Sequence, residues 1–230
     1  MVTYAKYLEG KTIALVSSGS SLKGKNQGPL IDSFDIVVRL NRGIPLDQHK
    51  YKDVGKRTDI LYNCLDGAPD AGGRIDGNFW RARGVRCVCS TYPKSEYFTF
   101  PERSLGLGGI IPTRWIPDAT YYPIKEEVKG RPNSGTTTLV DLLSFDIKEV
   151  RLFGMDFFRT LYDISYLKEG GNKEDFERVL STNPDRHDPD SQYLFFKNKL
   201  YAEDSRIKID EYFEKIIANP DYDSMYFKGN

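Results

Sequence analysis

Two short segments of the chain combine residues that bind anions with a residue that accepts a proton. In 131–135 (Arg-Pro-Asn-Ser-Gly), Ser134 and Gly135 stand where a loop is expected to become a helix. A hydroxyl and backbone N–H groups can meet an anion there. In 187–192 (His-Asp-Pro-Asp-Ser-Gln), His187 supplies an imidazole, whose reference pKa of ~6.5 suits proton transfer near neutrality. An anion cradle combined with a general base predicts group transfer from a nucleotide-activated donor.

The neighbours of Ser134 support the same chemistry. The guanidinium of Arg131 can form two parallel hydrogen bonds to a carboxylate or a phosphate. The helix N-terminus can bind the same anion from another side. Asn133 or Ser134 can cap the helix. A simple capping motif is the alternative interpretation of this segment, and a surface histidine at a helix start is the alternative for His187.

Small polar residues follow several of the expected strands. Ser18, Gly19 and Ser20 form a loop whose backbone N–H groups can wrap a phosphate, although no Walker motif follows. Asn41 and Asn63 each end an apolar strand. A side-chain amide has two donors and one acceptor, so it can hydrogen-bond both to sugar hydroxyls and to a carbonyl. The alternative is an ordinary strand-to-helix turn for the loop and a turn-forming residue for each asparagine.

The segment Asp188-Pro-Asp190 superficially matches the Asp-x-Asp signature of metal-dependent glycosyltransferases. Such aspartates normally end a strand beside a nucleotide diphosphate. Here Pro189 fits the first turn of a helix, with Asp188 as its cap. A helix cap is therefore our interpretation, and a metal site is the alternative. The second histidine, His49, is interpreted as a solvated loop residue.

Apolar runs and helical patterns alternate along the chain. We expect strands at 12–16, 35–41, 59–64, 85–91, 149–154 and 207–209, and helices at 77–83, 136–143, 190–200 and 211–218. This order predicts an α/β fold with a single doubly wound, mostly parallel sheet and helices on both faces. Ligands bind such sheets beyond the carboxyl ends of the strands. The candidate residues fall at such ends, including Gly154 and Asp156 after the strand at 149–154.

Length and composition limit the class of protein. The 230 residues are interpreted as one domain, 1–230, in which the polar segment of about 158–186 forms a lid. Hydrophobic residues make up 39% and charged residues 29%, which is typical of a globular protein. The 33 basic and 33 acidic residues balance, which argues against binding to nucleic acid. The oligomeric state is left open.

The cysteines and the start of the chain bear on location. The three cysteines are an odd number, and together with the lack of a secretory leader they favour reduced thiols. No run approaches the ~20 apolar residues needed to span a bilayer. We expect a cytoplasmic protein without a transmembrane segment, and leave peripheral membrane attachment open.

Several of these segments, in their order along the chain, resemble the motifs of a known enzyme family. The segments 32–42 and 53–60 resemble the large sialylmotif of the animal-type sialyltransferases, glycosyltransferase family 29. The segment 131–154 resembles their small sialylmotif, and 187–192 their very-small motif. The same segments are similar to the compact bacterial sialyltransferases of family 42.

The resemblance implies a fold, a substrate and a mechanism. It implies a Rossmann-like domain, a variant of the GT-A fold, that binds a CMP-activated sugar and passes the sugar to a glycan acceptor. In the bacterial enzymes, residues equivalent to Asn41, Asn63, Arg131 and Ser134 contact the donor, and the equivalent of His187 is the base. The implied reaction is an inverting transfer of sialic acid from CMP-sialic acid to a sugar hydroxyl, without metal or cofactor. Further residues implied in donor binding are Ser18, Gly19, Ser20, Asn133, Gly135, Gly154, Asp156 and Phe158, with Tyr162 and Tyr166 as donors to the leaving phosphate.

The chain departs from the family pattern at four positions. Ser18 stands in place of an Asn, Gln192 in place of a Glu, and Phe158 in place of a Tyr of the bacterial enzymes. Ile13 fills a cysteine position, so the disulfide of the animal enzymes cannot form, which fits a reducing compartment. Three alternatives stay open: transfer of Kdo or another CMP-activated nonulosonic acid, a CMP-sugar-binding protein with impaired catalysis, and a divalent-metal enzyme that uses Asp188 and Asp190.

Overall fold

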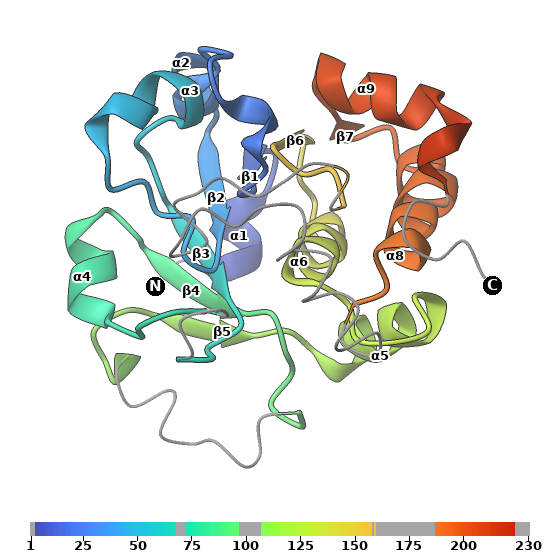
Figure 1. The fold of residues 1–230 in the computed structure, drawn as a ribbon. Coiled ribbons are helices and arrows are strands. Elements are labelled where there is room, and N and C mark those ends of the chain that lie inside the picture. Colours follow the sequence, from blue (N-terminus) through green and yellow to red (C-terminus); the bar gives the residue numbers. More distant parts are fainter. Residues whose placement is uncertain (1–2, 68–71, 97–106, 158, 160–186, 224–230) are drawn as a thin grey trace.

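The computed structural model describes residues 3–67, 72–96, 107–157, 159 and 187–223. Its centre is a seven-stranded sheet in the order β5-β4-β3-β2-β1-β6-β7, and every neighbouring pair of strands is parallel (Figure 1). The strands are β1 (Thr12–Val16), β2 (Ile36–Leu40), β3 (Ile60–Asn63), β4 (Cys87–Ser90), β5 (Thr113–Trp115), β6 (Glu149–Phe153) and β7 (Ile207–Lys208). The predicted α/β fold with a parallel sheet is confirmed.

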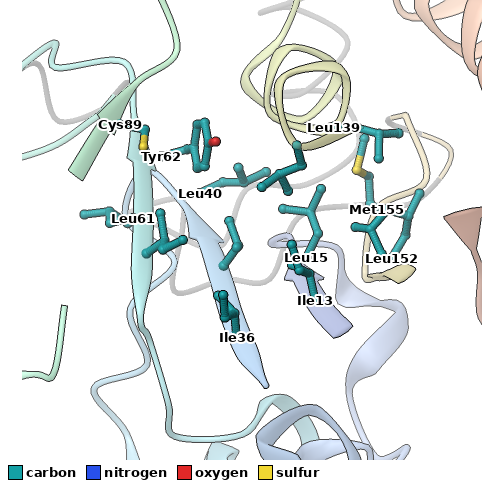
Figure 2. Packing of buried hydrophobic residues seen from close by; sticks show 14 of the residues in the cluster. Ile13, Leu15, Ile36, Leu40, Leu61, Tyr62, Cys89, Leu139, Leu152 and Met155 are labelled. Carbon is teal, nitrogen blue, oxygen red and sulfur yellow. The ribbon is translucent and has the colours of Figure 1, made fainter. Parts of the chain in front are cut away.

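The central strands are apolar along their length because helices cover both sides of the sheet. Ile13 and Leu15 of β1 belong to the larger core cluster together with Leu139 of α6 (Ser134–Leu143). Ala14, which points to the opposite face, belongs to a second cluster with Ile31 of α2 (Gly28–Ser33). Figure 2 shows Ile13 and Leu15 on the side of the sheet that faces α6. Burial on both faces explains the continuous hydrophobic runs from which the strands were predicted.

Several predicted helices are present near their expected bounds. They are α4 (Gly77–Ala82), α6, α8 (Pro189–Phe195) and α9 (Glu211–Ala218). Asn133 is the N-cap of α6, because its side-chain oxygen accepts from the Thr136 N–H at 2.8 Å. Asp188 caps α8 as predicted. The helix expected at 190–200 is α8 followed by a π-helix, η4 (Phe196–Tyr201).

The sequence did not predict any element between β4 and α6, where the structure has β5 and α5 (Asp118–Glu127). Pro123 lies inside α5 and masks its helical pattern, and β5 is a three-residue edge strand that is only partly buried. The short helices α1 (Tyr4–Leu8), α2 and α3 (Tyr51–Val54) were also missed. Three-residue 3₁₀ turns lie at η1 (Ser20–Leu22), η2 (Gln48–Lys50) and η5 (Pro220–Tyr222).

Most of the predicted lid, about 158–186, lies outside the described residues, as do Phe158, Tyr162 and Tyr166. The lid and the single-domain organisation therefore remain predictions. Among the helices that the structure describes, none has the length and apolar character needed to cross a membrane.

Candidate active site

The candidate residues gather at the carboxyl edge of the sheet. From β1 the strand order runs through β2 to β5 on one side and through β6 to β7 on the other. The carboxyl ends of β1 and β6 therefore flank the point where the order reverses, the usual place for a ligand crevice in such sheets. The loops after β1, β2, β3 and β6 and the N-terminus of α6 all meet at this edge (Figure 1).

The loops that follow β1 and β6 are docked against each other. The Gly19 N–H donates to the carbonyl oxygen of Gly154 at 2.9 Å, and a Cβ on Gly19 would lie 2.4 Å from that oxygen. Gly154 itself has φ +60°, a conformation that favours glycine. The Gly19 N–H is thus engaged within the protein and does not contribute to the phosphate cradle expected of this loop. Ser18 and Ser20 are half-buried on the same loop.

Asn41 connects the end of β2 to the loop after β3 and to the N-terminus of α6. Its backbone is in the left-handed region, with φ +47°. Its Oδ1 accepts from the Cys64 N–H at 2.9 Å, and its Nδ2 donates to Ser134 Oγ at 3.2 Å. Because Oδ1 faces a backbone donor, the orientation of the amide is fixed and Ser134 Oγ must be the acceptor. The hydroxyl proton of Ser134 is then available for another acceptor.

The N-terminus of α6 presents further donors beside that hydroxyl. The Thr136 N–H is bonded to the Asn133 side chain and the Thr137 N–H to the Asn133 carbonyl oxygen. The N–H groups of Ser134 and Gly135 have no acceptor within the described part of the chain. A hydroxyl, two backbone N–H groups and the positive end of the helix dipole are the kinds of donor that bind anions in proteins.

Asn63 lies close to this cradle but uses its side chain internally. The residue is fully buried, its Nδ2 donates to the Gly72 carbonyl oxygen at 3.0 Å, and its Oδ1 accepts from the Leu65 N–H at 2.7 Å. The amide therefore holds the loop after β3 in place. Direct contact of Asn63 with a donor, which the sequence predicts, remains a prediction.

His187 is attached to the loop that leads into α6. Its Nδ1 lies 3.0 Å from the carbonyl oxygen of Arg131. A carbonyl oxygen can only accept, so Nδ1 carries the proton and, in the neutral ring, the lone pair is on Nε2. The guanidinium of Arg131 stacks over the Tyr92 ring, 4.6 Å from its centroid. The predicted base is thus bonded to the residue three positions before Ser134.

The start of α8 makes further contacts with the same loop. Ser191 Oγ donates to the Val128 carbonyl oxygen at 2.9 Å. Gln192 Oε1 accepts from the Asn133 N–H at 2.7 Å and from the Thr136 hydroxyl at 3.0 Å. The sequence identified Gln192 only as a departure from a motif and did not predict these contacts. Its position five residues after His187, in the first turn of α8, was the available signal.

The two carboxylates of the Asp188-Pro-Asp190 segment have structural partners. Asp188 Oδ1 accepts from the N–H groups of Asp190 and Ser191, as a helix cap does. Asp190 Oδ1 lies 2.8 Å from Arg159 Nη2, whose side chain is fully buried. Among the described residues, no group of three or more His, Cys, Asp or Glu side chains is arranged to hold a metal ion.

Asp156 lies just after β6 at the same edge of the sheet. It is 6% exposed and precedes Phe157, which has φ +51° and packs 5.0 Å from the Phe196 ring. This packing fixes the chain just after β6. Gly154 and Asp156 therefore lie where the sequence predicted, at the carboxyl end of their strand.

Three charged residues of the segments 32–42 and 53–60 have structural contacts. Arg39 is buried next to the last residue of β2, where its guanidinium donates to the carbonyl oxygens of Arg57 and Val54. Burial lowers the pKa of Arg39 to about 10. Asp59 Oδ2 accepts from the Val37 N–H and from Arg57 Nη2. These contacts hold β2 and β3 in register and so place Asn41 at the end of β2.

Comparisons with known proteins address the family and the fold of the chain. The model of glycosyltransferase family 29 (sialyltransferase) matches residues 5–177, more than half of the chain. The structure of a mammalian sialyltransferase in complex with Gal-beta-1-3GalNAc-ortho-nitrophenol superimposes with a TM-score of 0.55 at 16% identity, covering 90% of this chain and 72% of that one. The sialyltransferase CstII from Campylobacter jejuni, in complex with the substrate analogue CMP-3FNeuAc, gives 0.51 at 15% identity, covering 86% and 81%.

At these identities the two structures establish the fold. No curated protein matches the chain in sequence. The family match ends before His187 and Gln192, whose contacts with Arg131 and Asn133 come from the structure alone. The family match itself establishes what the spacing of the motifs predicted: the chain belongs to glycosyltransferase family 29, the sialyltransferases, and is a glycosyltransferase.

Proposed function

We propose that the protein transfers sialic acid from CMP-sialic acid to a sugar hydroxyl of a glycan acceptor, with inversion at the anomeric carbon and without a metal ion. The observation that carries the proposal is the bond between His187 Nδ1 and the Arg131 carbonyl oxygen. It brings a base with its lone pair on Nε2 to the loop that forms the anion cradle. A base and an anion cradle in one crevice are the two parts that such a transfer requires.

The cradle would hold the phosphate of the leaving CMP. The Ser134 hydroxyl, directed by Asn41, and the N–H groups of Ser134 and Gly135 are donors on rigid elements. Their interaction strengthens as negative charge develops on the departing phosphate. Our proposed donor site also includes residues near the cradle and residues of the loops after β1 and β6. They are Arg131, Asn133 and Asn63, together with Ser18, Ser20, Gly154 and Asp156. Phe158, Tyr162 and Tyr166, outside the described residues, remain predicted contributors.

The proposed reaction is a single displacement. The acceptor oxygen attacks the anomeric carbon as its proton passes to Nε2 of His187. The bond from that carbon to the phosphate oxygen breaks, and its electron pair leaves with CMP. Attack from the face opposite the leaving group inverts the configuration. Direct attack requires the base and the phosphate site to lie on opposite sides of one sugar.

A metal-dependent reaction would require free carboxylates at Asp188 and Asp190. Both carboxylates already have partners in the structure, which supports a reaction without a metal ion. Asp188 is bonded to the N–H groups at the start of α8, and Asp190 is paired with Arg159. Metal binding there would break the cap and the ion pair. A monophosphate leaving group also carries less charge than a diphosphate, so hydrogen-bond donors at α6 can stabilise it.

The ligands bound in the structural neighbours guide the choice of substrates. The Campylobacter enzyme was bound to CMP-3FNeuAc and the mammalian enzyme to a galactoside. We therefore propose CMP-sialic acid as donor and a galactoside as acceptor. We also propose a cytoplasmic, reducing location, because Cys64, Cys87 and Cys89 are all free thiols.

The experiment is a transfer assay with the whole chain. CMP-sialic acid or CMP-Kdo is supplied with a galactoside, with and without EDTA, and CMP and glycoside are both quantified. We expect equal amounts of CMP and sialylated galactoside, no loss of rate in EDTA, and little product from CMP-Kdo. Dependence on a divalent ion would contradict the metal-independent mechanism, and faster transfer from CMP-Kdo would change the donor. CMP binding without turnover would identify a binding protein.

A further inference from the structure

The start of α8 docks onto the loop between α5 and α6 through three side chains. His187 contacts the Arg131 carbonyl oxygen, Ser191 contacts the Val128 carbonyl oxygen, and Gln192 contacts the N-cap residue of α6. Two of these contacts are made to carbonyl oxygens of the loop. The third, from Gln192, reaches the first residues of the helix that carries the anion cradle.

Gln192 completes the cap of α6 from another helix. Its side chain is fully buried, and Oε1 accepts from both the Asn133 N–H at 2.7 Å and the Thr136 hydroxyl at 3.0 Å. In a capping box, the side chain at the third helical position reaches back to the N–H of the cap residue. Thr136 occupies that position in α6, but its hydroxyl donates to Gln192, whose oxygen takes the Asn133 N–H instead.

We propose that Gln192 is a positioning residue, whose carbonyl oxygen fixes the base His187 relative to the phosphate cradle at Ser134. The inference rests on the proposed function, because it concerns the distance between the two groups of that mechanism. Gln192 lies five residues beyond His187, in the first turn of α8, and its partner Asn133 directly precedes Ser134. One oxygen thus ties the element that carries the base to the element that carries the cradle.

In the side-chain amide of Gln192, the oxygen makes the contacts to α6 and the nitrogen makes none. Nε2 is buried and has no hydrogen-bond partner among the described residues. The contacts that join α8 to α6 therefore need an acceptor and do not need the amide donor. A glutamate at 192 offers the same acceptor oxygen, whereas a methionine fills the same space and offers none.

Three variants test the proposal: Gln192→Met, Gln192→Glu and, as a matched control at an exposed glutamine, Gln48→Met. The rate of transfer and the KM for CMP-sialic acid are measured for each. For Q192M we expect kcat to fall ~10- to 100-fold, with KM within ~3-fold of wild type, because the reacting groups are misplaced while the donor contacts remain. Q192E and Q48M are expected to stay within ~3-fold of wild type in both constants.

A second measurement does not depend on turnover. The chain has two histidines, His49 and His187, so nitrogen-15 spectra resolve the tautomer of each ring, with His49→Gln for assignment. His187 is expected in the Nδ1–H tautomer in wild type, Q192E and Q48M, because the Arg131 carbonyl oxygen accepts that proton. In Q192M the contact is released, and the signal of the Nε2–H tautomer should appear.

The outcomes separate this inference from the proposed function. An unchanged kcat or an unchanged His187 tautomer in Q192M would overturn the positioning role, as would a Q192E variant as impaired as Q192M. If wild type transfers no sugar, the proposed function fails, and the tautomer comparison still decides whether Gln192 positions His187. Should Q192M not fold, Thr136→Val removes one of the two bonds to Oε1. T136V is then expected to show the same changes to a smaller extent, and no change would overturn the proposal.

Discussion

The side-chain amide of Asn41 orients the hydroxyl of Ser134. Nδ2 donates to Ser134 Oγ at 3.2 Å, while Oδ1 is held by the Cys64 N–H at 2.9 Å. One side chain therefore connects β2, the loop after β3 and the N-terminus of α6. It also determines that the Ser134 hydroxyl accepts from Asn41 and directs its own proton elsewhere, which in our proposal is toward the leaving phosphate.

This relationship predicts a large effect from replacing the amide nitrogen of Asn41 with an oxygen. In Asn41→Asp a carboxylate oxygen replaces Nδ2. The Ser134 hydroxyl would then donate its proton to that carboxylate and would no longer donate to the phosphate. We expect kcat to fall ~10- to 1000-fold, as for removal of one preorganised donor. The fall in kcat is measured from steady-state rates of transfer. Asn26→Asp is the matched control, since Asn26 is exposed and shares the left-handed backbone. Wild-type turnover in N41D would show that Asn41 does not orient Ser134.

A second prediction concerns Ser134 itself. Ser134→Ala removes the hydroxyl but leaves the backbone N–H groups, so kcat should also fall ~10- to 1000-fold. Because Asn41 acts through the same hydroxyl, the double variant N41D/S134A should be about as slow as the slower single variant. A double-mutant cycle on kcat provides the measurement. Full additivity of the two effects would mean that the residues act separately.

A third prediction concerns how α6 is anchored. Asp141 is fully buried in α6 and is bonded by both Arg114 Nη atoms, one at 2.8 Å, and by the Tyr62 hydroxyl at 2.6 Å. Arg114→Met would leave a buried carboxylate without its cation, at a cost of ~3 kcal/mol or more in the free energy of unfolding. Arg74→Met, which removes the exposed partner of Asp76, should cost less than ~1 kcal/mol.

Urea denaturation of the wild type and both variants would measure these costs. The double variant R114M/D141L is expected to be more stable than R114M alone, since it no longer buries an unpaired charge. Equal stability of R114M and wild type would show that the ion pair does not anchor α6.

A fourth prediction concerns alkaline pH. Burial raises the pKa of Tyr92 to about 12, above the ordinary value of 10.0. Between these values an unfolded chain has released the phenol proton while the folded protein keeps it. The free energy of unfolding should therefore be unaffected by this group below pH 10 and should fall as the pH rises from about 10 to about 12. Thermal unfolding across this range would show it. Tyr92→Phe should show a shallower decline, and an identical decline would contradict the assignment.

The sequence predicted the α/β class and the parallel sheet because parallel strands buried on both faces leave long apolar runs. It also predicted that His187 and Ser134 face one crevice. The structure places His187 Nδ1 3.0 Å from the Arg131 carbonyl oxygen, and the shared crevice remains a prediction. Local signals sufficed for the caps: Asn133 and Asp188 each accept from an N–H two or three residues later. Such contacts depend on neighbours in sequence.

What the sequence missed depends on contacts between distant residues. The roles of Asn63 and Gln192 follow from partners 9 and 59 residues away, and their side chains are engaged inside the protein. Gly19 was expected in a phosphate loop, but its N–H is taken by Gly154 across the junction of β1 and β6. Pro123 concealed α5, because tertiary packing stabilises a helix that its own sequence disfavours.

The most direct measurement is turnover by His187→Ala alongside its affinity for CMP, with His49→Ala as the control. Removal of the base should lower the rate of transfer at least ~100-fold. The dissociation constant for CMP, measured by calorimetry, should stay within ~3-fold of wild type, since the cradle at α6 is intact. A variant that transfers sugar at nearly the wild-type rate would contradict the role of His187 as the base.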